Sequence, residues 1–305
     1  MHPFRFAVRT TGTPTAAAWL ARARRVEELG YSTLVVVDHL IRQLAPIPAL
    51  VAAAAATTTL RLGVHVFDND LRNPVMLANE IATLDALSGG RLELGIGAGW
   101  RRTDYAQTGI PYDAPKVRID RLVEAIAILK RLFNGDRVDF DGVHYRLRGA
   151  RLGTPVVQRP HPPLVIGGGG PRILGIAARE ADIVSFIPRM SARGRPTIGE
   201  ATTAATEEKV ARVRRAAGDR FDRLELCAFV LHVNVADRSP LGAIGARVEG
   251  LASGAIDTPY LLAGTRSSVR EQLLRLRERL GISYWTIPAS GMEGFAPVVE
   301  DLAGR

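Results

Sequence analysis

The chain has 305 residues, of which 47% are hydrophobic, and a formal net charge of +9. This is enough apolar material for one large core, and an α/β barrel of ~250 residues often forms a single domain. No apolar run approaches the ~20 residues of a membrane span, and Arg5, Arg9 and Pro14 break the first one, so neither a signal peptide nor a membrane partner is expected. The lone cysteine, Cys227, rules out a disulfide within the chain and indicates a cytoplasmic setting.

Arginine carries almost all of the positive charge, because lysine occurs only at positions 116, 130 and 209. Two explanations stand side by side: the base composition of a GC-rich genome, and attraction of an anionic ligand. The arginines are scattered, with no basic block and no recognisable nucleic-acid module, so no nucleic-acid partner is expected.

Short β-like runs alternate with longer helical segments along the chain. Several runs are continuously apolar, as parallel strands buried on both faces are. The alternation suits a barrel or a doubly wound sheet, and eight repeats without a break in composition favour a (β/α)8 TIM barrel, one domain over residues 1–305. The predicted strands are Phe4–Arg9, Thr33–Asp38, Arg61–Phe67, Arg91–Gly97, Leu164–Gly167, Asp182–Ile187, Leu224–Val235 and Ser283–Pro288. The predicted helices are Pro14–Leu29, Pro48–Thr57, Pro74–Ser88, Ala114–Phe133, Arg172–Glu180, Thr203–Ala217 and Ser267–Leu280.

The segment Asn134–Pro163 interrupts this rhythm between the fourth and fifth strands. It is rich in Gly, Pro and Arg, and VDFDGVHYRL predicts a hairpin with its turn at Asp141-Gly142. Long loops of this kind are lids or binding loops, or else structural excursions. A second loop, Pro188–Thr202, has a similar composition and is expected to be mobile.

Active sites of parallel barrels gather at the carboxyl ends of the strands, which selects a short list of residues. The second strand ends at Asp38-His39, and a histidine there is either a proton donor or acceptor or a structural residue. The third strand carries His65 and then the acidic residues 68–70. No second ligand set accompanies these acids, so we expect a solvated turn and no metal site.

Two glycine-rich segments follow the fourth and fifth strands. The first, Gly95–Gly99, reads G-x-G-x-G, lacks the spacing of a dinucleotide fingerprint and shows no helix start directly after it. Its glycines would let a flat ligand approach the backbone, and Trp100 would line a pocket or fill core. The second, Gly167–Gly170, precedes Pro171 and a helix. Free backbone N–H groups and a helix N-terminus predict phosphate binding there, with a plain tight turn as the alternative.

Several segments, taken in order, carry a resemblance to known proteins. They are Asp38-His39, TLDALSGGRLELGIGAGW (Thr83–Trp100), Asp104-Tyr105 with the helix after it, VQRPHPPLVIGGGGPRILGIAAREAD (Val157–Asp182) and LLAGTRSSVREQLLRLRERLGISY (Leu261–Tyr284). They resemble the luciferase-like superfamily of flavin- and coenzyme F420-dependent oxidoreductases over nearly the whole chain.

The resemblance implies a flavin-like ring lying across the carboxyl mouth of the barrel. His39 would lie beside the ring as the catalytic proton donor or polarising group. The pair His65-Val66 matches a non-prolyl cis peptide that supports the ring, and Gly168–Gly170 match the phosphate-binding segment. The residues expected at the cofactor are Asp38, His39, His65, Val66, Gly97, Gly99, Gly167, Gly168, Gly169 and Gly170.

The sequence departs from the sugar-phosphate dehydrogenase branch of this superfamily. Trp100 stands where that branch has an acid/base glutamate, and Ile41–Pro46 lacks its tryptophan, so the general reductase or monooxygenase branches fit better.

Three hypotheses about function follow from the resemblance. The first is hydride transfer between F420 and an organic substrate, with Trp100 in the substrate pocket. The second is an FMN-dependent monooxygenase using reduced flavin and O2. The third is a barrel that binds such a cofactor without turnover. The resemblance also implies a homodimer.

Overall fold

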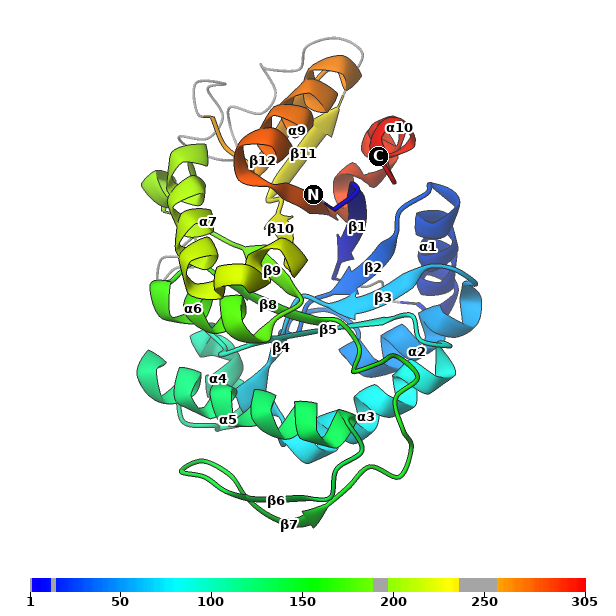
Figure 1. Ribbon diagram of the computed structural model, residues 1–305. Helices are drawn as coiled ribbons and strands as arrows, with labels where there is room; N and C mark the ends of the chain where they lie inside the picture. The colour runs from blue at the N-terminus through cyan, green and yellow to red at the C-terminus, as the bar shows by residue number, and fades with distance from the viewer. Residues whose placement is uncertain (1, 12–14, 189–196, 236–256) are drawn as a thin grey trace. The chain divides into compact units, whose positions relative to one another are not determined.

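A ring of hydrogen-bonded strands forms the centre of the protein in the computed structural model, which describes residues 2–11, 15–188, 197–235 and 257–305 (Figure 1). The strand order is β3-β2-β1-β13-β10-β9-β8-β5-β4, and β3 also pairs with β5, which closes the ring. The fold is a (β/α)8 TIM barrel, as predicted. The strands of the ring are β1 (Arg5–Thr10), β2 (Thr33–Val36), β3 (Arg61–Val64) with β4 (Phe67–Asp68), β5 (Leu92–Gly97), β8 (Leu164–Gly168), β9 (Ile183–Phe186), β10 (Glu225–Phe229) and β13 (Ile282–Pro288).

Helices connect these strands, and the predicted helices form with bounds shifted by a few residues. Two further helices, α4 and α10, were not predicted. None of the helices in the described ranges is long and apolar enough to cross a bilayer. The helices are α1 (Ala16–Glu28), α2 (Pro46–Ala56), α3 (Pro74–Leu87), α4 (Arg102–Thr108), α5 (Pro115–Phe133), α6 (Pro171–Glu180), α7 (Thr203–Ala217), α9 (Arg266–Leu280) and α10 (Met292–Leu302).

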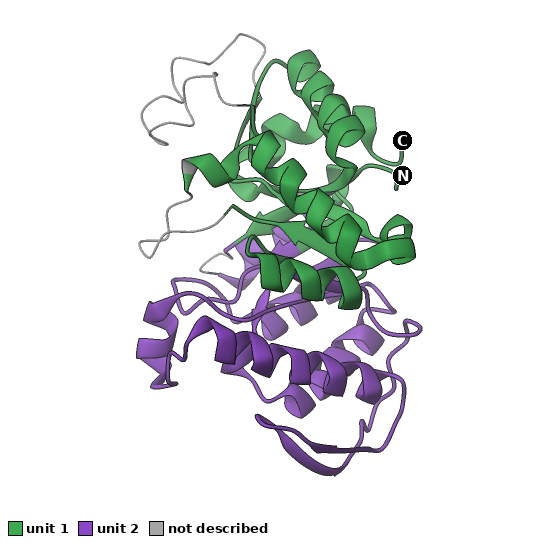
Figure 2. Ribbon diagram, turned by 60° about the vertical axis from the view of Figure 1, so that its left-hand side comes forward, with its two compact units in different colours: residues 1–10, 25–34, 167–305 green, residues 11–24, 35–166 purple. Residues whose placement is uncertain are grey.

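The chain divides into two compact units, coloured separately in Figure 2. Unit 1 comprises residues 1–10, 25–34 and 167–305, and unit 2 comprises residues 11–24 and 35–166. Neither unit is a continuous stretch of sequence, so the division does not follow a linker. The single domain over residues 1–305 stays a prediction.

In unit 1, β1 presents two different faces. Phe6 lies edge-on to Phe295 of α10, with ring centroids 5.5 Å apart, so this face meets the helix layer. Because side chains alternate along a strand, Arg5, Ala7 and Arg9 point to the opposite face. On that face Arg5 binds Glu225 of β10 through two hydrogen bonds, of 2.9 and 2.7 Å. The inner face of β1 therefore begins with a paired arginine.

The predicted strand Leu224–Val235 is wrong as a single element. β10 ends at Phe229, and His232–Val235 forms a separate strand, β11, which pairs in parallel with β12 (Leu261–Gly264). The chain changes partner between the two strands, because the Val230 N–H donates to Thr286 whereas the Leu231 N–H donates to Tyr260. Cys227 is fully buried in β10, as expected of a core residue.

In unit 2, the predicted hairpin is confirmed as β6 (Val138–Asp141) and β7 (Arg146–Ala150), drawn beside α5 in Figure 1. Glu124 of α5 anchors its turn by accepting the backbone N–H groups of residues 143, 144 and 145 at 2.9, 3.0 and 3.1 Å. This anchoring favours a structural excursion over a mobile lid. The second loop, Pro188–Thr202, lies for the most part outside the described residues.

The other end of the excursion is fixed to α3. Asp85 is fully buried and accepts the N–H groups of Val157 and Gln158 at 2.7 and 3.0 Å. Its second oxygen accepts the Gln158 side-chain amide at 2.7 Å. Nearby, Arg91 donates to the carbonyls of Ala54, Leu60 and Ser88, which joins the last turn of α2, the loop before β3 and the end of α3. The Leu-Ser-Gly-Gly-Arg motif of residues 87–91 therefore has a structural role, because Arg91 joins neighbouring segments of unit 2.

We predict that Asp85→Ala lowers the free energy of unfolding by about 2–3 kcal/mol, because it leaves three donors without their acceptor. Denaturant unfolding of the variant measures this loss. Asp222→Ala, at an exposed residue, is the control and should change stability by less than about 0.5 kcal/mol. Equal stability of the two variants would contradict the assignment of Asp85 as an anchor.

Candidate active site

The carboxyl end of β2 in unit 2 is organised by two carboxylates, of which Asp38 is the first. Asp38 is buried and forms a two-pronged ion pair with Arg72, one prong of which measures 3.0 Å. It also accepts the backbone N–H of Asp68 at 3.0 Å. The Asp38 carboxylate therefore ties the end of β2 to the segment after β4. Its predicted contact with a cofactor stays a prediction.

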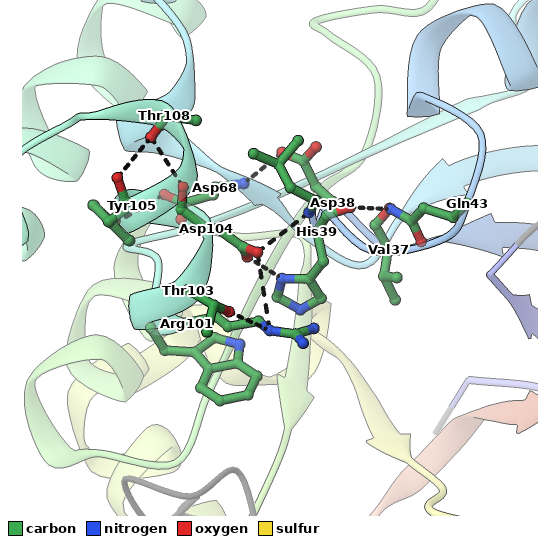
Figure 3. A network of polar contacts seen from close by, with 12 residues as sticks. Val37, Asp38, His39, Gln43, Asp68, Arg101, Thr103, Asp104, Tyr105 and Thr108 are labelled. Atoms are coloured by element: carbon green, nitrogen blue, oxygen red, sulfur yellow. Dashed lines mark hydrogen bonds and ion pairs between the residues drawn. The ribbon is translucent and has the colours of Figure 1, made fainter.

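Asp104 is the second carboxylate, and it holds the predicted catalytic histidine (Figure 3). It lies in α4, is almost completely buried, and accepts His39 Nδ1 at 2.7 Å and the Leu40 N–H at 3.2 Å. Arg101 lies 3.9 Å from the same carboxylate. An ionised carboxylate can only accept hydrogen bonds, so His39 carries its proton on Nδ1. The imidazole is thereby fixed in tautomer and in orientation.

The remaining surroundings of His39 leave one ring edge open. The Gln43 side chain donates to the His39 and Val37 carbonyls at 2.8 and 2.9 Å, which fixes the backbone. Trp100 meets the imidazole edge-on, with centroids 5.6 Å apart and planes at 89°. The indole is 45% exposed, so Trp100 lines the surface beside His39 and does not fill core. His39 Nε2 has no hydrogen-bond partner in the described part of the chain and can exchange a proton with a ligand.

The expectation of a solvated turn at residues 68–70 is wrong. The segment leads into a 3-10 turn, η1 (Asn69–Leu71), in which Asp68 and Asn69 are buried and the Asp70 side chain has 0% exposure. Tyr105 of α4 donates to Asp70 at 3.0 Å, and Arg121 of α5 lies 2.9 Å from it. The acids are buried because they receive bonds from α4 and α5. Among the described residues, no group of three or more His, Cys, Asp or Glu side chains could hold a metal ion.

This burial changes proton affinities in the cluster. Burial, together with the charges of Asp70 and Asp38, raises the pKa of Asp68 to about 6, against the opposing hydrogen bonds from the Asp70 N–H and the Tyr105 hydroxyl. Burial and the charges of Asp68 and Asp70 also raise the pKa of Tyr105. The phenol therefore remains a hydrogen-bond donor at neutral pH.

The G-x-G-x-G segment packs against the third predicted strand, which is broken at His65-Val66 into β3 and β4. His65 and Val66 are joined by a cis peptide bond, as the resemblance implies. A Cβ on Gly97 would lie 2.7 Å from Val66 Cγ2, and one on Gly99, which has φ +68°, would collide with Tyr105 and Asp68. Protein atoms therefore require glycine at both positions, whatever ligand binds. The expectation that no helix starts after this segment is wrong, because α4 begins at Arg102.

The second glycine segment belongs to unit 1 and lies where β8 meets α6. A Cβ on Gly170 would meet nothing within 4 Å, so the space beside it is open. No side chain caps α6, whose first turn has Pro171 and no acidic residue. A helix N-terminus with free N–H groups and a favourable dipole attracts an anion. The segment thus fits the phosphate predicted for it.

The predicted site residues thus fall into two groups. Unit 2 brings together the residues after β2, the broken third strand and the glycines after β5, whereas Gly167–Gly170 lie in unit 1. Sequence reasoning did not assign a site role to Asp104. The sequence did contain a signal for Asp104, because Asp104-Tyr105 is one of the segments that carry the family resemblance. The helix that contains it, α4, was not predicted. Asp68, Arg72 and Tyr105 were missed as supporting residues for the same region.

The barrel fold is shared with solved structures of low sequence identity. An F420-dependent secondary alcohol dehydrogenase in complex with an F420-acetone adduct has a TM-score of 0.80 at 18% identity, covering 98% of this chain and 99% of that one. The coenzyme F420-dependent tetrahydromethanopterin reductase of Methanopyrus kandleri has a TM-score of 0.79 at 17% identity, covering 99% and 98%.

The model of the luciferase-like monooxygenase family matches residues 1–240, and the chain belongs to this family. An F420-dependent glucose-6-phosphate dehydrogenase of Beutenbergia cavernae is 34% identical over 210 residues, 66% of this chain and 60% of that protein. A 5,10-methylenetetrahydromethanopterin reductase of Archaeoglobus fulgidus is 35% identical over 133 residues, 44% and 38% of the two chains. The match thus spans about three fifths of the first relative.

The raised pKa of Asp68 predicts a pH dependence of stability. Its ordinary value is 3.8, so the folded protein holds this proton to higher pH than the unfolded chain does. The stabilisation is fully present below about pH 4 and is lost as pH rises through about 6, and two pKa units correspond to about 3 kcal/mol. Asp68→Asn keeps the acceptor oxygen but cannot ionise. Relative to wild type, its free energy of unfolding should therefore rise between about pH 4 and pH 8.

Chemical denaturation of both proteins at the two pH values measures this difference. Asp222→Asn is the control, since Asp222 is exposed. A stability difference between Asp68→Asn and wild type that is the same at both pH values would contradict a buried, proton-binding Asp68.

Proposed function

We propose that this protein is an F420-dependent oxidoreductase that transfers a hydride between the cofactor and a small organic substrate. The observation that carries the proposal is His39, held through Nδ1 by the buried Asp104 at 2.7 Å at the carboxyl end of a barrel strand. The family membership and the F420-dependent relatives support the choice of cofactor.

The position of His39 suits the transfer of one proton at Nε2. With Nδ1–H donating to Asp104, proton exchange is confined to Nε2. Asp104 also stabilises the imidazolium that exists before a proton is given up. Nε2 therefore donates to, or accepts from, a substrate oxygen whose charge changes during the reaction. Asp104 is a positioning residue, because it acts through His39.

F420, when bound, would supply or accept the hydride, and the protein supplies orientation and charge. The residues that would hold its phosphate are Gly168–Gly170 and the first turn of α6. Trp100 would form one wall of the substrate pocket, next to His39.

An FMN-dependent monooxygenase is the second candidate, supported by the matched family's description as monooxygenases. The same glycine segment would hold the phosphate of FMN. A non-catalytic cofactor-binding barrel is the third. The sugar-phosphate chemistry of the glucose-6-phosphate dehydrogenases is not part of the proposal, because Trp100 stands in place of the expected glutamate.

Titration of the cofactor-free protein with F420 and with FMN, followed by tryptophan fluorescence, separates these candidates. We expect micromolar or tighter binding of F420 and binding of FMN at least about tenfold weaker, a difference of about 1.4 kcal/mol. Trp100 is the expected reporter, so Trp100→Phe should reduce the signal. Tighter binding of FMN would transfer the proposal to the monooxygenase, and binding of neither would overturn both.

We predict that His39→Ala lowers kcat by about 10²–10⁴-fold while leaving the dissociation constant for F420 within a few-fold, because only proton transfer is lost. The assay follows oxidation of reduced F420 by a panel of carbonyl compounds and activated alkenes. Asp104→Asn should shift the pH profile of kcat, because a neutral amide no longer stabilises the imidazolium.

His144→Ala, in the hairpin turn, is the matched control and should retain full activity. Full activity of His39→Ala would remove His39 from the mechanism. No turnover by the wild type with any acceptor, combined with tight F420 binding, would support the non-catalytic barrel.

A further inference from the structure

Two arginines lie four residues apart on the inner face of β1, and their partners differ. Arg5 has a carboxylate partner, Glu225, and its guanidinium lies 4.2 Å from the centroid of the Tyr284 ring. On β10, the residue four positions after Glu225 on the same face is Phe229. Arg9 meets this ring, with the guanidinium carbon 3.8 Å from the centroid. The second arginine thus faces an aromatic ring where the first faces an acid.

Arg9 is a cation without a carboxylate in the described residues. Its Nη2 donates to the Val230 carbonyl at 3.0 Å, which together with the Phe229 ring contact makes up its interactions in that part of the chain. Guanidinium has five N–H donors, so most of its fork is unused. The residue is only partly exposed, and burial lowers its pKa to about 10, which means that no anion offsets the cost of desolvation.

The geometry of Arg9 suits one class of ligand. The contact with the Phe229 ring and the hydrogen bond to the Val230 carbonyl hold the guanidinium in place, and its planar fork matches the two oxygens of a carboxylate or phosphate. Arg9 is the penultimate residue of β1, so it lies at the end of the strands where barrel active sites form. A bound anion would therefore stabilise this partly buried cation.

We propose that Arg9 binds an oxyanion of the substrate, either a carboxylate or a phosphate group, at the carboxyl end of β1. The assignment of this anion to the substrate rests on the proposed function, in which the cofactor's phosphate belongs to the glycine segment before α6. The substrate class is then acidic: a small organic molecule with a reducible or oxidisable group and one anionic group.

Calorimetric titration of the cofactor-free protein with benzoate and with inorganic phosphate tests the proposal, with benzamide as the uncharged counterpart of benzoate. We expect saturable binding of at least one anion, with millimolar affinity or better, and none of benzamide. Arg9→Met keeps the aliphatic stem and should weaken anion binding at least about tenfold. Arg9→Lys should retain part of the affinity, since it keeps the charge but loses the fork.

Three controls separate this role from a structural one. Arg146→Met removes an equal charge from an exposed position on β7 and should leave anion affinity unchanged. Arg5→Met should lower the melting temperature because it leaves Glu225 unpaired, whereas Arg9→Met should preserve or raise it. The dissociation constant for F420 should be the same for Arg9→Met and wild type within about twofold.

Each of the opposite results would overturn the assignment. Wild-type protein that binds neither anion, or Arg9→Met that binds them as well as wild type, excludes an oxyanion site at Arg9. Parallel loss of anion and F420 affinity in Arg9→Met would assign the anion to the cofactor. Failure of the wild type to bind F420, with anion binding intact, would instead remove the proposed function and leave Arg9 as an anion site.

Discussion

The hydrogen bonds accepted by Asp104 are the constraint on which the proposed chemistry depends. A buried carboxylate is costly unless donors or cations surround it. Here His39 Nδ1–H and the Leu40 N–H donate to it, and the Arg101 guanidinium lies 3.9 Å away. The segment after β2 has no regular structure of its own, so the position of the imidazole is set by α4. The short helix α4, which follows β5, thus holds His39, the candidate catalytic residue that follows β2.

Acidic side chains that accept backbone N–H groups also fix three other irregular segments of unit 2. Asp85 fixes the end of the excursion, Glu124 fixes its hairpin turn, and Asp38 fixes the segment after β4. In a chain with net charge +9, these three acids accept hydrogen bonds from the protein's own backbone, and Asp38 and Asp85 are buried. The arginines outnumber them, and Arg9 shows what remains: a cation whose described neighbours are a carbonyl and an aromatic ring.

Much of the fold could be predicted because several strands buried on both faces form continuous apolar runs, and each of the eight predicted strands contributes to the ring, the seventh only through its first part. Other features carried weak local signals. α4 has seven residues and no capping side chain, and α10 contains Pro297 in its interior, so both resist prediction from periodicity. The sequence predicts one strand over Leu224–Val235 because the apolar run continues, whereas the hydrogen-bond partner changes after Val230. His39 could be selected by position, but Asp104 could not, since their contact spans 65 residues.

The glycine motifs show why family resemblance and function need separate arguments. Gly97 and Gly99 are among the most recognisable residues of the chain, yet Val66, Asp68 and Tyr105 already require glycine there. Such residues identify the fold, because any member with this broken strand needs them. Gly170 differs, since a side chain there would meet only open space and an uncapped helix. Within the same segment a Cβ on Gly168 would lie 2.5 Å from Ile173 Cγ2, so packing requires that glycine, whereas the open space at Gly170 beside an uncapped helix N-terminus leaves room for a phosphate.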